Sequence, residues 1–357
     1  SGLLIVFFTF VTGLSRIYFS QQQSLAVRWS SRGQADLSAH NYQPAVDELR
    51  AALRYSRDDH DYQLGLAEAL IGLGKTDEAE TYLVNLWAEQ PENGRVNLDL
   101  ARVAARDGQT QRAQRYYHNA IYANWPGDQE EEIRQARIEL IEYLLRIKSN
   151  AQAESELISL QVYLGDDTKD QSRLGDLFMQ AGDNEHALAA YRMSLKAEPH
   201  DAVALAGAGN AAFALGRYST ALHYFEQRLS LVPKDDQSRD KMAMAELVLK
   251  MDPFRPQIPV AERDRAVVDD FAIAGDRLKS CTAAGGSPSS DPKKNLQQTW
   301  DDLKRQVTLN GLRRNPDMVN ATMATVFAIE RQANAHCGGP SNADTALLLI
   351  SKLNEGS

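Results

Sequence analysis

Alanines recur at a fixed interval along most of this chain, and this repetition restricts its fold more than any other feature. The interval is 34 residues within each of two sets of three alanines, and a step of 40 residues separates the sets. The six positions are Ala45, Ala79, Ala113, Ala153, Ala187 and Ala221. A period of about 20 to 50 residues indicates one supersecondary unit stacked many times, so that neighbouring copies share a continuous core.

Residues at constant offsets from these alanines predict that each unit is a pair of helices joined by a tight turn. Five residues before four of the alanines stands a glycine, which suits the left-handed conformation after a helix. These turn glycines are Gly74, Gly108, Gly182 and Gly216. Twelve residues before five of the alanines stands a small residue, where the two helices of a pair would touch. These small residues are Gly33, Ala67, Ala101, Gly175 and Gly209.

The second helix of each pair has its own periodic residues. A large side chain follows every alanine by four residues and therefore lies on the same helical face. These side chains are Leu49, Leu83, Tyr117, Leu157, Tyr191 and Phe225. A proline stands twelve residues after three of the alanines and ends the second helix. These prolines are Pro91, Pro199 and Pro233.

The pattern resembles the tetratricopeptide repeat (TPR) family. Trp29 occupies the first aromatic position of that consensus, Leu174-Gly175 its Leu-Gly pair, and Tyr42 and Tyr218 the aromatic at the turn. The resemblance covers residues 26–235. It implies an all-α, right-handed helical-repeat solenoid of about six helix pairs with a concave groove.

The fourth repeat, near residues 134–167, departs most from the pattern. Ile141 stands in place of the small residue and Lys148 in place of the turn glycine. The six extra residues fall near 125–128, and the acids up to Glu132 suit the start of the next helix.

The resemblance implies that the first helix of each repeat lines the groove and binds partner proteins. The candidate groove residues are Arg95, Arg102, Arg106, Leu64, Leu98, Glu142 and Phe213. One interpretation is a basic spot, bordered by carboxylates, that docks an acidic segment of a partner. The alternative is a solvated face with ion pairs between neighbouring repeats, each worth about 0–1 kcal/mol.

The chain opens with an apolar run from Leu3 to Phe19 that spans about 26 Å as a helix. This length is at the short end for a bilayer, and the run predicts a transmembrane anchor over residues 1–20, where Arg16 would reach an interface. The anchor residues are Leu3, Phe7, Phe8, Phe10 and Tyr18. The alternative is the hydrophobic region of a secretory signal. The arginines that follow favour a cytoplasmic body by the positive-inside rule.

The last third predicts further helices without the repeat pattern. A capping helix is expected over 236–252, and a C-terminal helical region over 260–357, with helices at 260–281, 294–312, 316–336 and 342–353. The composition of residues 282–293 is that of a flexible loop. This region is interpreted as an atypical cap or a small separate bundle.

The two cysteines, Cys281 and Cys337, each end one of these helices. A disulfide between them would close a loop with a sequence separation of 56 residues and, in the entropic model, add about 4 kcal/mol to the free energy of unfolding. Two buried free thiols or a redox function are the alternatives. A disulfide requires an oxidising compartment, which favours a periplasmic body over a cytoplasmic one.

The charge balance and the motifs exclude several functions. The net charge of −9 argues against nucleic-acid binding, and no motif for catalysis, a cofactor or a metal occurs. We therefore predict a single-pass membrane scaffold without enzymatic activity, which binds other subunits of a membrane complex, integral membrane proteins among them, through the groove and the anchor. The alternatives are a transient assembly or maturation factor for a membrane or exported complex, and an enzyme with a site in the C-terminal region.

Overall fold

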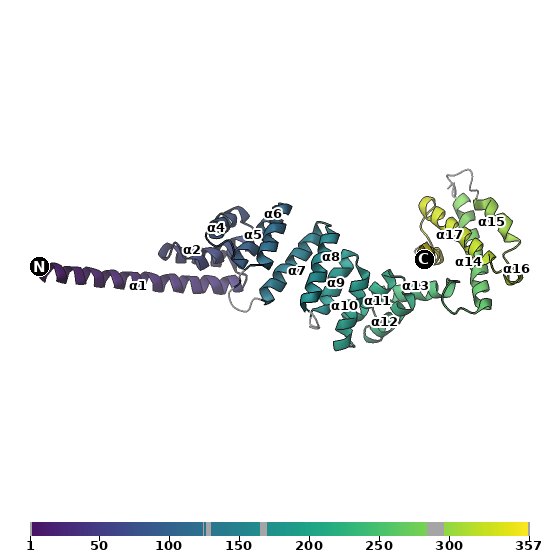
Figure 1. Cartoon of the computed structure of the whole chain (residues 1–357), viewed down its shortest axis with the longest axis horizontal. Helices are drawn as coiled ribbons and strands as arrows, with labels where there is room; N and C mark the ends of the chain where they lie inside the picture. Colours follow the sequence, from purple (N-terminus) through teal and green to yellow (C-terminus); the bar gives the residue numbers. More distant parts are fainter. Residues whose placement is uncertain (1, 124, 126–129, 165–169, 284–295, 356–357) are drawn as a thin grey trace. The chain divides into compact units, whose positions relative to one another are not determined.

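The computed structural model describes residues 2–123, 125, 130–164, 170–283 and 296–355, with side chains from residue 12 onward. Every regular element in these ranges is an α-helix, in agreement with the all-α prediction (Figure 1). The chain divides into two compact units, residues 1–163 and 164–357. The insertion at 126–129 and most of the expected loop at 282–293 lie outside the described residues.

The first unit consists of four helix pairs, each formed by two helices consecutive in the sequence. Their core is continuous from Ala45 in the first pair to Ala153 in the fourth. The helices are α1 (Gly2–Ser38), α2 (Tyr42–Tyr55), α3 (His60–Gly72), α4 (Thr76–Glu89), α5 (Gly94–Arg106), α6 (Thr110–Ile121), α7 (Glu130–Arg146) and α8 (Asn150–Leu164).

The second unit holds two more helix pairs followed by a group of six helices. The pairs are α9 (Gln171–Ala181) with α10 (Asn184–Ala197), and α11 (Ala202–Ala214) with α12 (Tyr218–Leu231). The later helices are α13 (Asp236–Met251), α14 (Val260–Ala283), α15 (Leu296–Lys304), α16 (Leu309–Arg314), α17 (Met318–His336) and α18 (Asn342–Glu355).

The turn inside each helix pair has the predicted left-handed residue. Gly74, Gly108, Gly182 and Gly216 have φ between 71° and 91°. The two turns that lack glycine have the same geometry, since His40 has φ of 59° and Lys148 of 60°. The Lys148 N–H donates to the Leu145 carbonyl, as the Gly182 N–H does to that of Met179. The divergent fourth repeat therefore keeps the common turn, and Lys148 adopts a left-handed conformation that is unfavourable for a residue with a Cβ atom.

The contact between the two helices of a pair follows the periodic positions. All six alanines are fully buried, and the large residues four positions later are at most 3% exposed. A Cβ atom on Gly33 would lie 2.7 Å from Leu49 Cγ, and one on Gly209 would lie 2.6 Å from Phe225 Cε1. The small residue is therefore required because the large side chain of the partner helix lies directly against it.

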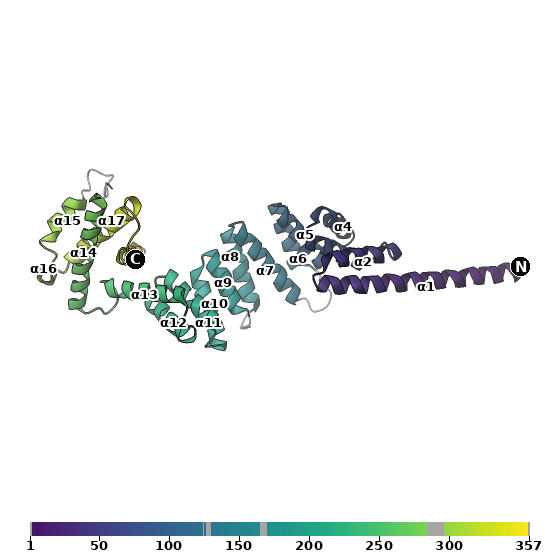
Figure 2. The same cartoon turned by 180° about the vertical axis from the view of Figure 1, so that it is seen from behind.

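The predicted membrane anchor is wrong. Among the residues that the structure describes, no helix is both long enough and apolar enough to cross a bilayer. The apolar run is the first part of the 37-residue helix α1; Arg16 interrupts it, and three glutamines at residues 21–23 follow it. The same helix continues into the first repeat, where Ala26 is buried (Figures 1 and 2). The single-pass localisation, with either a periplasmic or a cytoplasmic body, fails with the anchor.

The C-terminal helices share one core with the end of the repeats. Tyr218 of α12 and Val248 of α13 belong to the same buried cluster as Phe271 of α14 and Leu347 of α18. The expected helix 294–312 is two helices, because Thr308 caps a new one by accepting from the Gly311 N–H. The C-terminal region thus covers the apolar face at the end of the last repeat.

Candidate functional site

The first helices of the four repeats in the first unit enclose a cavity of about 780 Å³. We call this cavity the repeat groove. Its volume lies within the range of about 300–1,000 Å³ that is usual for ligand pockets. Its walls include Leu37 from α1, Glu68 and Ile71 from α3, Arg95, Leu98, Asp99 and Arg102 from α5, Trp125, and Glu131, Glu132 and Gln135 from α7.

Apolar side chains form part of the groove wall. Leu37 and Ile71 are partly buried and pack on the core of the first unit, to which Leu98 belongs. Trp125 is 5% exposed, and its indole N–H donates to the Ala120 carbonyl at 2.9 Å. The Trp125 ring lies so close to Gly94 that a Cβ atom there would come within 2.3 Å of it. Glycine at the start of α5 therefore leaves the space that the indole ring occupies.

The arginines of the predicted basic spot already bind groups of the chain itself. Arg95 forms an ion pair with Glu68. Arg102 donates to both carboxylate oxygens of Glu139, at 2.9 Å from Nε and 2.8 Å from Nη2, and donates from Nη1 to Asp99 Oδ1 at 2.8 Å. Arg106 donates to the Ile71 carbonyl at 3.0 Å. The structure thus has the ion pairs between neighbouring repeats that the second interpretation of these arginines describes.

Asp99 is the most buried charged residue among those that line the repeat groove, and its side chain is 3% exposed. Burial raises the pKa of Asp99 to about 7, and Glu68 adds to this rise while Arg102 and Arg95 oppose it. Only its Oδ1 atom accepts a hydrogen bond; no donor among the described residues reaches Oδ2. One Glu132 oxygen, Oε2, is likewise buried without a hydrogen-bond partner in the described part of the chain.

A second cavity of about 520 Å³ shares Arg102 with the repeat groove. It also contains Arg106 and Glu142, two of the predicted groove residues, together with Glu139 and Arg146. Three arginines and two glutamates line this cavity, so it has an excess of one positive charge. When the Arg102–Glu139 pair is set aside, two arginines and one glutamate remain.

Two predicted groove residues lie elsewhere. Leu64 is 6% exposed and belongs to the core of the first unit. Phe213 is in the second unit, where it packs edge-on against Tyr218 with ring centroids 5.2 Å apart. Of the predicted anchor residues, Tyr18 is 61% exposed, and the side chains of the others lie outside the described residues.

Asp99, Glu131 and Glu132 were not among the predicted groove residues. A signal for Asp99 exists in the sequence, because it precedes Arg102 by three positions and such residues are neighbours on a helix. The acids at 130–132 form the first turn of α7, as expected, but their approach to α5 depends on packing between repeats.

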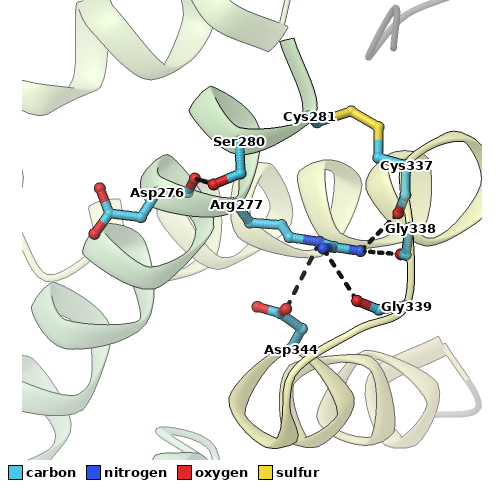
Figure 3. The surroundings of a disulfide bond; sticks show 8 residues. All are labelled: Asp276, Arg277, Ser280, Cys281, Cys337, Gly338, Gly339 and Asp344. Carbon is cyan, nitrogen blue, oxygen red and sulfur yellow. Dashed lines mark hydrogen bonds and ion pairs between the residues drawn. A yellow bond between two sulfur atoms is a disulfide. The ribbon is translucent and has the colours of Figure 1, made fainter. Parts of the chain in front are cut away.

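The two cysteines of the second unit form a disulfide, with their Cα atoms 5.3 Å apart (Figure 3). Both residues are buried, Cys281 at 2% exposure and Cys337 at 9%. The bond joins the end of α14 to the end of α17.

Arg277 adds a second link between the same two helices. It donates to the carbonyls of Cys337 at 2.9 Å, Gly338 at 2.7 Å and Gly339 at 3.3 Å (Figure 3). Its Nε atom also lies 3.6 Å from an Asp344 oxygen. A cation at the carbonyl end of α17 stabilises that helix terminus.

Buried carboxyl groups lie in the same group of helices. Burial raises the pKa of Asp270 to about 8, and the carboxyl groups of Asp269, Asp252 and Glu330 add to the rise. Burial also raises the pKa of Glu330 to about 7. Within the described ranges, no three His, Cys, Asp or Glu side chains form a group that could hold a metal ion.

Comparisons with known proteins identify the repeats. Models of the tetratricopeptide repeat match residues 36–86, 72–124 and 172–236. Over 208 residues the chain is 28% identical to the tetratricopeptide repeat protein 21 homolog of Caenorhabditis elegans. That match covers 56% of this chain and spans 15% of the length of the relative. The chain therefore contains tetratricopeptide repeats.

Several solved structures have a similar arrangement of helices. PilF of Pseudomonas aeruginosa is 17% identical, with a TM-score of 0.46 over 62% of this chain and 99% of that one. PilW, a type IV pilus biogenesis factor, is 16% identical, with a TM-score of 0.46 over 60% and 97%. YrrB, a TPR protein with an unusual peptide-binding site, is 14% identical, with a TM-score of 0.42 over 54% and 96%. No conclusion about partners follows from similarities this distant.

Proposed function

We propose that this chain, which contains tetratricopeptide repeats, is a protein-interaction scaffold and a subunit of a multi-protein complex. Its repeat groove binds a segment of a partner protein. The observation that carries this proposal is the groove itself, in which helices from four successive repeats combine apolar side chains with charged ones. TPR domains are in general interaction modules, and the matching families are not catalytic.

The chemistry of the groove suits a polypeptide ligand. Leu37, Ile71 and Leu98 offer apolar surface for side chains, while the carboxylates and guanidinium groups around them offer hydrogen bonds that fix register. A repeat surface specifies its ligand by the side chains that it displays, which the fold alone does not determine.

A charge-swap variant tests the proposal without removing an ion pair. Glu68→Arg combined with Arg95→Glu keeps the pair and the net charge but exchanges the positions of one negative and one positive charge in the repeat groove. The matched control reverses the Arg50–Glu78 pair, which joins α2 to α4 outside the groove. The tagged full chain and both variants are purified from the native source, and the recovered proteins are quantified.

The proposal predicts one set of proteins that the wild type and the control retain and the groove variant loses. Recovery of these proteins in a fixed molar ratio to the chain supports a stable subunit. Recovery of them only after chemical crosslinking supports the transient assembly factor. If both variants retain every partner equally, the groove is not the binding surface and the proposal fails.

A further inference from the structure

The charge of the repeat groove is opposite to that of the basic spot expected from the sequence. Four carboxyl groups line it, those of Glu68, Asp99, Glu131 and Glu132, against the two guanidinium groups of Arg95 and Arg102. Ionisation of all six gives the groove a net charge of −2, and protonation of Asp99, whose pKa lies at about 7, still leaves a net charge of −1. Charges in a partly enclosed cavity interact more strongly than charges on an open surface, so this excess selects the sign of a ligand.

The guanidinium groups have little capacity for an acidic ligand. Arg102 already donates from all three of its nitrogen atoms, to Glu139 and Asp99. Arg95 is paired with Glu68. A carboxylate from a partner would therefore compete with carboxylates of the chain that already pair with both guanidinium groups.

The carboxyl groups, in contrast, can still accept hydrogen bonds from a ligand. Asp99 Oδ2 and Glu132 Oε2 are buried, and neither has a hydrogen-bond partner among the residues that the structure describes. A buried acceptor without a partner costs about 1–3 kcal/mol, so a rotation of the carboxyl group that brings this oxygen to a ligand N–H recovers that free energy. The Asp99 side chain is 3% exposed and lines the cavity, which distinguishes it from an acid on a solvated surface.

We propose that the repeat groove binds a lysine or arginine side chain on an extended segment of a partner protein, whose cationic N–H group donates to Asp99 and Glu132. Leu37, Ile71 and Leu98 contact the aliphatic stem of that side chain. This inference rests on the proposed function, because it specifies the partner chemistry of the same groove. It excludes the acidic segment that the sequence suggested.

Three labelled peptides test the inference on the full chain. They are acetylated, fluorescein-labelled peptides of equal length that alternate alanine with lysine, with glutamate or with glutamine, and binding is followed by fluorescence anisotropy at two salt concentrations. The groove variant is Asp99→Asn with Glu132→Gln. The control variant is Asp58→Asn with Asp107→Asn, which removes the same charge from exposed positions outside the groove.

We expect the lysine peptide to bind more tightly than the other two, and more weakly as salt rises. The groove variant should lose at least about tenfold in affinity, as expected for a charged hydrogen bond, while the control variant keeps nearly all of it. Equal losses in the two variants would mean attraction by net charge alone and would overturn the inference. Circular dichroism checks folding, and if the double variant does not fold, Glu132→Gln is compared with Asp58→Asn.

The peptide outcomes separate this inference from the proposed function. Tighter binding of the glutamate peptide overturns the cation inference but leaves a peptide-binding groove. Binding of none of the peptides, with native partners still lost from the Glu68/Arg95 charge swap, overturns the inference alone. Retention of all native partners by that swap overturns the proposed function, whatever the peptides do.

Discussion

Replacing Lys148 by glycine should stabilise the first unit. Lys148 has φ of 60° in the turn between α7 and α8, at the position where four other repeats have glycine. Its N–H and that of Ser149 donate to the carbonyls of Leu145 and Leu144 at 3.0 and 2.8 Å. The glycine turn at Gly182 has the same pattern of hydrogen bonds, so glycine fits at 148 without rearrangement.

The magnitude follows from two opposing terms. The left-handed conformation costs a residue with a Cβ atom roughly 1–2 kcal/mol. Glycine loses more conformational entropy on folding, which offsets about 0.5–1 kcal/mol of that gain. The net increase in the free energy of unfolding therefore lies between about 0 and 1.5 kcal/mol, and its midpoint of about 0.75 kcal/mol corresponds to roughly 2–3 °C in the melting temperature of a unit of this size.

The matched control is Lys148→Ala, which removes the same charge near the end of α7 but keeps the Cβ atom. Hydrogen exchange of peptides from α7 and α8 measures the stability of this unit separately from the other, and urea unfolding measures the whole chain. We expect Lys148→Gly to slow exchange relative to both the wild type and Lys148→Ala. If the glycine and alanine variants are equally stable, the positive φ is not a source of strain and the reasoning is refuted.

Two further predictions concern the second unit. The Cys281→Ser/Cys337→Ser double variant should lose about 4 kcal/mol of unfolding free energy, because the bond closes a loop with a sequence separation of 56 residues. Urea unfolding measures this loss. The control is the fully reduced wild type, whose loss should be at least as large. Asp270→Asn should stabilise the chain at pH 8 but hardly at pH 4. The wild-type pKa rises from 3.8 to about 8 on folding, so the folded state holds the proton more tightly and the free energy of unfolding falls by about 1.4 kcal/mol per pH unit between those values. Parallel pH dependence in the wild type and the variant would contradict the assignment.

The repeating part of this protein follows from the spacing of its residues along the chain. The spacing of the alanines, the turn glycines and the large residues four positions later specified which faces of the helices meet, and the structure confirms those contacts. This succeeds because the contacts within a helix pair depend on local geometry that recurs every 34 residues. Even the exception at Lys148 occurs at its expected position in the turn.

The contacts between side chains of different repeats depend instead on how the helices pack in three dimensions. Arg102 and Glu139 are 37 residues apart, and their pairing depends on how α5 lies relative to α7. The burial of Asp99 has the same origin. The anchor prediction failed on a different ground, because no helix among the described residues is both long enough and apolar enough to cross a bilayer. The apolar run begins α1, the helix that enters the first repeat. Periodic positions specify the architecture, but the charge of the groove results from packing between its helices.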